Sequence, residues 1–241
     1  MTGPVTAAAD PGQDQLKWNL FLLLSAIFIA ALVTSNLIFQ KFFTWTPFGL
    51  YTFEISVGIL PYPITFLVTD IISEIYGKRR ANQVVLSGLF ASLFVLVIIL
   101  IADAVPQAAW SPVSDSQFHQ VFGLFGPAVM ASMVAYLAAQ FIDIRVYHFW
   151  KQLTGGRHLW LRNNGSTIFS QLIDTSLVLL LLSATGAIEW SRFWGLLQSG
   201  FLFKVLVALL DTPLLYGATW LLRRRFNLQM GQEIEAQHAQ P

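Results

Sequence analysis

Six apolar stretches constrain this chain of 241 residues, because each is long enough to cross the hydrocarbon core of a bilayer. A helix needs about 20 residues for that crossing. Charged residues make up only 11% of the chain, against about 25% in an ordinary soluble domain, and the mean hydropathy is +0.61. We therefore predict an all-α membrane protein, a six-transmembrane-helix bundle with spans near residues 18–39, 52–76, 84–104, 118–144, 167–188 and 193–222.

The two ends of the chain differ from this apolar middle. Residues 1–16 are polar and rich in Pro, Gly and Ala, so we expect a disordered N-terminal tail. Residues 17–225 form the predicted six-helix transmembrane domain, and residues 226–241 a polar C-terminal tail. The first apolar stretch is long enough to span, which argues against a cleavable signal peptide.

The basic residues predict an orientation, because cytoplasmic loops are enriched in Lys and Arg. Eleven of the fourteen fall on one side: one before the first span, three after the second, four between the fourth and fifth, and three after the sixth. The opposite loops hold Lys41 and Arg192, and Lys204 lies inside the sixth span. An even number of spans then places both termini in the cytoplasm of a multi-pass protein.

Several polar side chains lie inside the predicted spans, where a charge costs at least about 2.5–3.5 kcal/mol on insertion scales. Asp70 and Glu74 are spaced i and i+4 on one face of the second span. Lys204 lies on the same face of the sixth span as Asp211, and Asn36 lies near the outer end of the first. Such residues predict a binding site for a small solute.

Two pairs of polar residues share the spacing Gln-x-x-Asp: Gln140 with Asp143 in the fourth span, and Gln171 with Asp174 in the fifth. Three residues apart on a helix, the amide and the carboxylate lie side by side. Together they offer acceptors and a donor, which suits the edge of a planar heterocycle with ring N–H and amino groups.

Structural roles compete with binding for some of these residues. Glu74 lies close to the basic residues 78–80 and can pair with them at the interface, and Asp143 can pair in the same way with Arg145. An ion pair between Asp174 and Lys204 would hold the last two spans together. These roles and substrate binding do not exclude each other.

The second span contains Pro61 and Pro63, which remove backbone donors and predict a kinked or broken helix in the membrane. Broken helices often line substrate cavities. A stripe of Ala131, Ala135 and Ala139 in the fourth span predicts close helix packing, and less readily a homodimer contact.

Other chemistry lacks support in the sequence. The chain has no cysteine, and its four histidines show no metal-ligand spacing. No metalloprotease, nucleophile-elbow, Walker A or dinucleotide-binding motif is present. We therefore expect neither an enzyme nor a cofactor or metal site, and the net charge of +1 does not suggest binding to nucleic acid.

Five motifs, in order along the chain, resemble the queuosine precursor transporter family, also called the vitamin uptake transporter family. The hallmark is PYPITFLVTDIISEIYGKRRA at residues 61–81. The others are TSN at 34–36, SMVAYLAAQFID at 132–143, STIFSQLIDT at 166–175 and FKVL at 203–206. The resemblance covers roughly residues 18–225.

This resemblance implies a bacterial inner-membrane importer of 7-cyano-7-deazaguanine and 7-aminomethyl-7-deazaguanine, the precursors of the tRNA base queuosine. A carboxylate would accept from the guanine-like edge, and Tyr62 or Phe66 would stack on the ring. The implied substrate contacts are Asn36, Asp70, Glu74, Gln140, Asp143, Gln171, Asp174 and Lys204.

Two transport modes stay open at this stage. The chain is either a stand-alone transporter, by facilitated diffusion or proton coupling, or a substrate-binding membrane subunit that needs an ATPase partner. It has no ATPase motif of its own.

Overall fold

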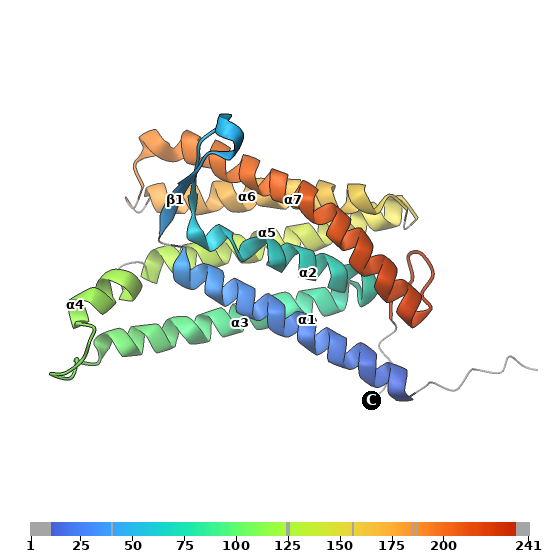
Figure 1. Ribbon diagram of the computed structural model, residues 1–241, viewed down its shortest axis with the longest axis horizontal. Coiled ribbons are helices and arrows are strands. Elements are labelled where there is room, and N and C mark those ends of the chain that lie inside the picture. Colours follow the sequence, from blue (N-terminus) through green and yellow to red (C-terminus); the bar gives the residue numbers. More distant parts are fainter. Residues whose placement is uncertain are drawn as a thin grey trace, which may run out of the picture.

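The computed structural model describes residues 11–234 except residues 40, 124–125, 156, 185 and 187. This part of the chain is almost entirely helical (Figure 1). Its long helices are α1 (Pro11–Ile38), α2 (Tyr62–Ile75), α3 (Gly77–Ala104), α5 (Gly126–Leu153), α6 (Leu159–Ala184) and α7 (Trp190–Phe226). The short elements are strands β1 (Phe42–Trp45) and β2 (Phe53–Ser56), 3₁₀ turns Pro47–Gly49 and Val57–Ile59, helix α4 (Asp115–Phe118) and a π turn, His119–Gly123.

Five helical segments among the described residues are long and apolar enough to cross a membrane: Gly12–Ile38, Val57–Ile75, Gly77–Ala104, Leu159–Ala184 and Trp190–Phe226. Helix α5 is also 28 residues long, although the side chains of its first residues lie outside the described set. The chain is thus an all-α membrane protein.

Helix α3 shows how the bundle meets lipid. It exposes Phe90, Phe94, Val97 and Ile101 by 52% to 69% of their surfaces. Water would not tolerate so large an apolar face on a soluble monomer, whereas the acyl chains of a bilayer solvate it.

The second predicted span differs from expectation at its start. Residues 53–56 form strand β2, which pairs antiparallel with β1 from Phe42 opposite Ser56 to Trp45 opposite Phe53. Phe53 and Ile55 are buried and Glu54 between them is exposed, the alternation typical of a strand. The helix prediction is therefore wrong for residues 52–56, and the helical segment starts at Val57.

The predicted break at the two prolines is confirmed. A 3₁₀ turn, Val57–Ile59, ends just before Pro61, and helix α2 starts at Tyr62 with Pro63 in its first turn. Proline is tolerated there because the first backbone N–H groups of a helix have no partner within it.

Helix α2 lies at the centre of the bundle, in contact with α1, α3, α5 and α7. Ten of its fourteen residues are buried, and they include Asp70 and Glu74. Its apolar residues Phe66 and Ile72 pack with Phe28 of α1 and Val85 of α3 in the main hydrophobic cluster.

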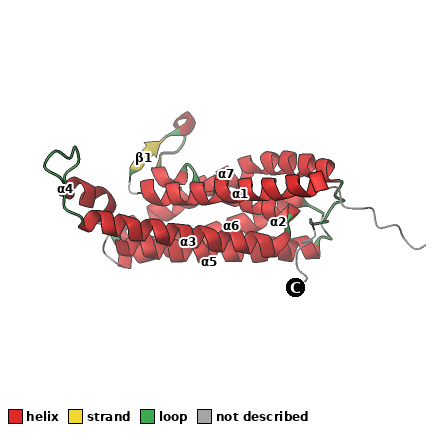
Figure 2. Ribbon diagram, turned by 90° about the horizontal axis from the view of Figure 1, so that it is seen from below, coloured by secondary structure: helices red, strands yellow, loops and turns green. Residues whose placement is uncertain are grey.

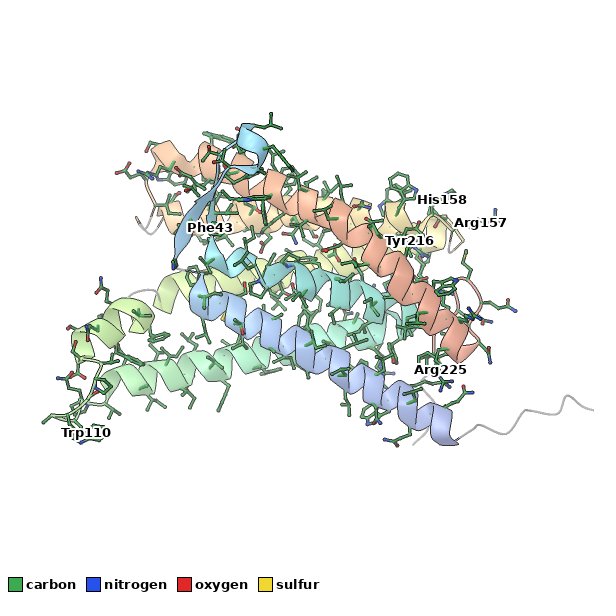
Figure 3. The ribbon with its side chains drawn as sticks, viewed as in Figure 1. Phe43, Trp110, Arg157, His158, Tyr216 and Arg225 are labelled. Atoms are coloured by element: carbon green, nitrogen blue, oxygen red, sulfur yellow. The ribbon has the colours of Figure 1, made fainter. Side chains whose placement is uncertain are left out.

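The two ends of the bundle differ in composition. The start of α1, the end of α7 and the α5–α6 connection lie at one end, and the β-hairpin and α4 lie toward the other (Figures 1 and 2). Figure 3 places Arg157 and Arg225 at the first end and Trp110 at the second. Lys17 and the basic residues 78–80 belong to the first end, which we call the basic end.

Candidate functional site

A cavity of about 170 Å³ lies between α1, the hairpin, α6 and α7. Its wall includes Glu54 of β2, Tyr62 at the start of α2 and Tyr136 of α5. Gly58 and Ile59, in the 3₁₀ turn that precedes α2, also line the cavity. Non-helical backbone is tolerated at membrane depth where it lines a cavity or is buried in protein.

An ion pair forms one wall of this cavity. The Lys204 Nζ of α7 lies 2.7 Å from Asp174 Oδ2 of α6, and the Tyr62 hydroxyl donates to the same oxygen at 2.8 Å. The ammonium also lies 4.6 Å from the centre of the Tyr62 ring, within cation–π range. The ion pair predicted between the last two spans is therefore present, and it faces a cavity.

Polar atoms without partners also line the cavity. Asp174 Oδ1, Asn36 Nδ2 and the Tyr136 hydroxyl oxygen are buried and have no hydrogen bond among the described residues. Buried polar atoms are nearly always paired in proteins, so several open ones around one cavity favour a ligand site. The set contains one carboxylate acceptor, one amide donor and one hydroxyl, which does either.

Gln171 lies next to this cavity and lines a smaller pocket of about 20 Å³. Ile59, Tyr62 and Lys204 lie between the two spaces, since all three residues line both of them. The Gln171 side chain is 3% exposed and its Oε1 has no donor among the described residues. Asp211, the carboxylate of the sixth span, lines the same small pocket.

Gln140 and Asp143 lie deeper, where α5 meets α2 and α6. Gln140 Nε2 donates to the Thr69 hydroxyl at 2.7 Å, and Asp143 Oδ1 accepts from the Ser170 hydroxyl at 2.9 Å. Both residues are 0% exposed. Arg145 is exposed, so Asp143 is not the interfacial partner of that residue.

Asp70 lies close to this pair and does not line the cavity. It is 2% exposed and interacts electrostatically with Asp143, Asp211, Glu74 and Arg162. The two Gln-x-x-Asp pairs thus have different surroundings: Asp174 borders the cavity, and Asp143 lies in the packed region between α2, α5 and α6.

Glu74 lies in a cluster of charges toward the basic end. Its carboxylate accepts from Arg162 at 3.1 Å, from the Tyr147 hydroxyl at 3.0 Å and from Arg223, and Lys151 Nζ lies 3.8 Å away. The predicted pairing with basic residues is correct in kind. The partners belong to α5, α6 and α7, however, and the basic residues 78–80 are not among them.

The last described residues join the same cluster. Glu233 accepts from Lys151 at 2.8 Å, and the backbone N–H of Ile234 donates to the Ile75 carbonyl at 2.7 Å. The chain after α7 therefore folds back onto the end of α2.

Tyr136 and Ser35 are cavity residues that the sequence motifs did not single out as contacts. Tyr136 lies one helical turn before Gln140, on the same face of α5, so helical spacing alone could have included it. Among the described residues, no group of three or more His, Cys, Asp or Glu is placed to hold a metal ion.

A membrane-spanning helical bundle with a broken helix, and with a cavity that carries an ion pair and open polar atoms, has the features of a membrane transporter. Comparison with known proteins agrees. The family model described as "Putative vitamin uptake transporter" matches residues 56–218, more than half of the chain, and this protein belongs to that family.

Two relatives have names that specify a substrate. A protein of Bacillus subtilis (strain 168) named "Probable queuosine precursor transporter" is 29% identical over 170 residues, which cover 70% of this chain and 73% of the relative. A Haemophilus influenzae protein of the same name is 25% identical over 222 residues, 85% of this chain and 88% of the relative. No solved structure matches the chain significantly. The protein is a transporter and not an enzyme.

Proposed function

We propose that this protein is a six-span importer of queuosine precursors in the bacterial inner membrane, with both termini in the cytoplasm. The names of the two relatives support the substrate class. The basic end supports the orientation, since it carries Arg157 and Arg225 and positive residues favour the cytoplasmic side. The cavity then lies between the hairpin at the outer side and the middle of α6 and α7.

The observation that carries the proposal is the open oxygen of Asp174 beside Lys204. The 7-deazaguanine edge has N1–H and 2-amino donors, and a carboxylate accepts from such donors in charge-assisted hydrogen bonds. Asp174 Oδ2 is already occupied by Tyr62 and Lys204, so Oδ1 is the atom that receives the substrate. A bidentate contact would require Lys204 to leave.

The rest of the cavity matches a planar heterocycle. Asn36 Nδ2 is an open donor for the ring's keto or imine acceptors. The rings of Tyr62 and Tyr136 lie 5.6 Å apart at an angle of 67°, so one offers a face and the other an edge to a flat ligand. A base without the matching donors would leave these buried polar groups without hydrogen bonds, and the site would therefore bind that base much more weakly.

Gln171, Gln140, Asp143, Asp70 and Glu74 are assigned different parts in this proposal. Gln171 reaches substrate from the smaller pocket if Tyr62 or Lys204 moves aside. Gln140, Asp143 and Asp70 lie in the packed region behind the cavity and do not contact the substrate. Glu74 holds the cytoplasmic ends of the helices together.

The test is uptake of labelled 7-cyano-7-deazaguanine by the purified chain in liposomes without any other protein. Asp174→Asn keeps the shape of the side chain and removes the charge, so we expect a loss of uptake with unchanged folding. Asp103→Asn is the matched control, because it also removes a carboxylate charge. Asp103 lies in the last turn of α3, outside the cavity, and pairs with the exposed side chain of His119.

Three results would contradict the proposal. Equal uptake by Asp174→Asn and Asp103→Asn would exclude Asp174 from the site. Binding of precursor without any transport would favour a binding subunit that needs an ATPase partner. If adenine competes for uptake as strongly as the deazaguanines do, the proposal that the site recognises the guanine-like edge is refuted.

A further inference from the structure

Two carboxylates buried in the bundle, those of Asp70 and Asp143, are not paired with a basic side chain in the part of the chain that the structure describes. In the described part of the chain, no Lys, Arg or His nitrogen lies within 4.0 Å of Asp70 or Asp143. The buried carboxylates of Glu74 and Asp174, in contrast, are both paired with basic side chains. The import of substrate through the cavity gives no role to the first two residues.

The charges around Asp70 do not balance it. It interacts electrostatically with carboxylates on three helices: Asp143 of α5, Asp211 of α7 and Glu74 of α2. Arg162 of α6 acts on it with the opposite sign, but that guanidinium is bound to Glu74 at 3.1 Å. The region between Asp70 and Asp143 therefore carries an excess of negative charge when both are ionised.

An open acceptor in the same region gives a second indication. Gln140 Oε1 is fully buried and has no donor among the described residues, whereas the Asp143 carboxylate accepts from two uncharged hydroxyl groups, those of Ser170 and Ser166. The Gln140 amide reaches from α5 to Thr69, the residue before Asp70 on α2, through its Nε2. This bond joins α5 and α2 one helical turn before Asp143 and one residue before Asp70, and the open Gln140 oxygen needs a donor, which an ionised carboxylate is not.

A proton resolves both features. Two neighbouring carboxylates in a site of low polarity are not both ionised, because like charges and burial each oppose it. A protonated carboxyl group is a donor as well as an acceptor, so one bound proton removes a charge and adds a donor to this group of buried acceptors.

We propose that Asp70 and Asp143 form a proton-binding site that couples substrate import to the inward movement of a proton. The proposal rests on the proposed function for its driving role. A proton from the outer side forms an O–H bond with one carboxylate oxygen, and that bond breaks on the cytoplasmic side, so the site returns to its starting charge and no redox step occurs.

The link to the substrate cavity runs through α6. Asp143 Oδ1 accepts from the Ser170 hydroxyl, and Ser170 lies one helical turn before Asp174. A shift of α6 on substrate binding therefore changes the hydrogen bonding of Asp143.

Infrared difference spectroscopy of the purified chain in lipid tests the site without substrate. We expect the carbonyl stretch of a protonated carboxylic acid at neutral pH, shifted in heavy water and lost in Asp143→Asn or Asp70→Asn. Asp103→Asn, in the last turn of α3, is expected to keep the band. Absence of the band in the wild type, or its survival in both variants, would overturn the proposal.

Transport tests the coupling. In liposomes, an inward proton gradient is expected to drive accumulation of 7-cyano-7-deazaguanine by the wild type. Asp143→Asn is expected to lose the response to the gradient and to retain exchange of internal for external precursor, which shows that the variant is folded. Accumulation driven by a sodium gradient, or an unchanged proton response in Asp143→Asn, would refute the coupling.

The two proposals fail in different ways. If the wild type exchanges no precursor, the proposed function and its coupling are refuted, while the infrared band still decides whether Asp70 and Asp143 bind a proton. If the wild type exchanges precursor but ignores the proton gradient, only the coupling is refuted.

Discussion

Glu74→Gln is expected to destabilise the protein more than any exposed charge substitution, because it removes the buried carboxylate that pairs with Arg162, Arg223 and Lys151. The Glu74 side chain is 2% exposed and that of Arg162 is 1% exposed. The substitution keeps the shape of the side chain, so it acts on the charge and on the hydrogen bonds from the two guanidinium groups.

The magnitude follows from burial. Removing one partner of a buried ion pair costs about 3–5 kcal/mol, because the remaining charge stays buried. The pair of Lys17 and Asp14 has side chains that are 24% and 34% exposed, and such pairs contribute only about 0.2–1 kcal/mol. Asp14→Asn is therefore the matched control.

Thermal unfolding in detergent measures the difference. A change of 1 kcal/mol shifts Tm by about 2–4 °C for chains of this size, so we expect Glu74→Gln to lower Tm by about 6–20 °C and Asp14→Asn by less than about 4 °C. Arg162→Gln alone and together with Glu74→Gln completes a double-mutant cycle, with an expected coupling of about 0.5–3 kcal/mol. Equal Tm values for Glu74→Gln and Asp14→Asn would refute the reasoning.

Two further predictions concern the cavity wall. Gly58→Ala is expected to lower Tm and uptake, since a Cβ there would lie 2.6 Å from the Ser35 carbonyl oxygen, whereas Gly217→Ala on α7 meets nothing within 4 Å and is expected to raise stability by about 0.5–1 kcal/mol; a harmless Gly58→Ala would contradict the close packing. Tyr62→Phe removes the hydroxyl that donates to Asp174, and hydrogen bonds to charged groups contribute about 1.5–3 kcal/mol. We expect a precursor affinity at least about tenfold weaker by titration, and an unchanged affinity would show that Tyr62 does not position Asp174.

The sequence alone was sufficient for the membrane class and for the break in the second span. The hydropathy of about 20 consecutive residues is enough to recognise a helix that can cross a membrane. A proline interrupts a helix through its own backbone, so its effect is also visible in the local sequence. The pair of Asp174 and Lys204 was also predicted, because both lie far from the ends of their helices and a buried charge needs a partner. The family resemblance supplied the substrate class, which charge and hydropathy do not contain.

The strand at residues 53–56 was not predicted, since its apolar residues continue into the next helix without an interruption in hydropathy. Pairing with β1 decides its form, and strand pairing is a contact between segments that are apart in the sequence. Arg162 is a similar case: it was assigned to a loop, but α6 starts at Leu159 and buries it against Glu74.

The carboxylates inside the membrane show which properties the sequence determines and which depend on the tertiary structure. Their presence at depth followed from residue type and span position, since every charge inside a bilayer requires compensation. Their separate surroundings did not: Asp174 borders the cavity with Lys204, Glu74 lies among basic residues of three other helices, and Asp70 and Asp143 face each other's charge. Compensation depends on which helices pack together and at what rotation, and those contacts join residues that are distant along the chain.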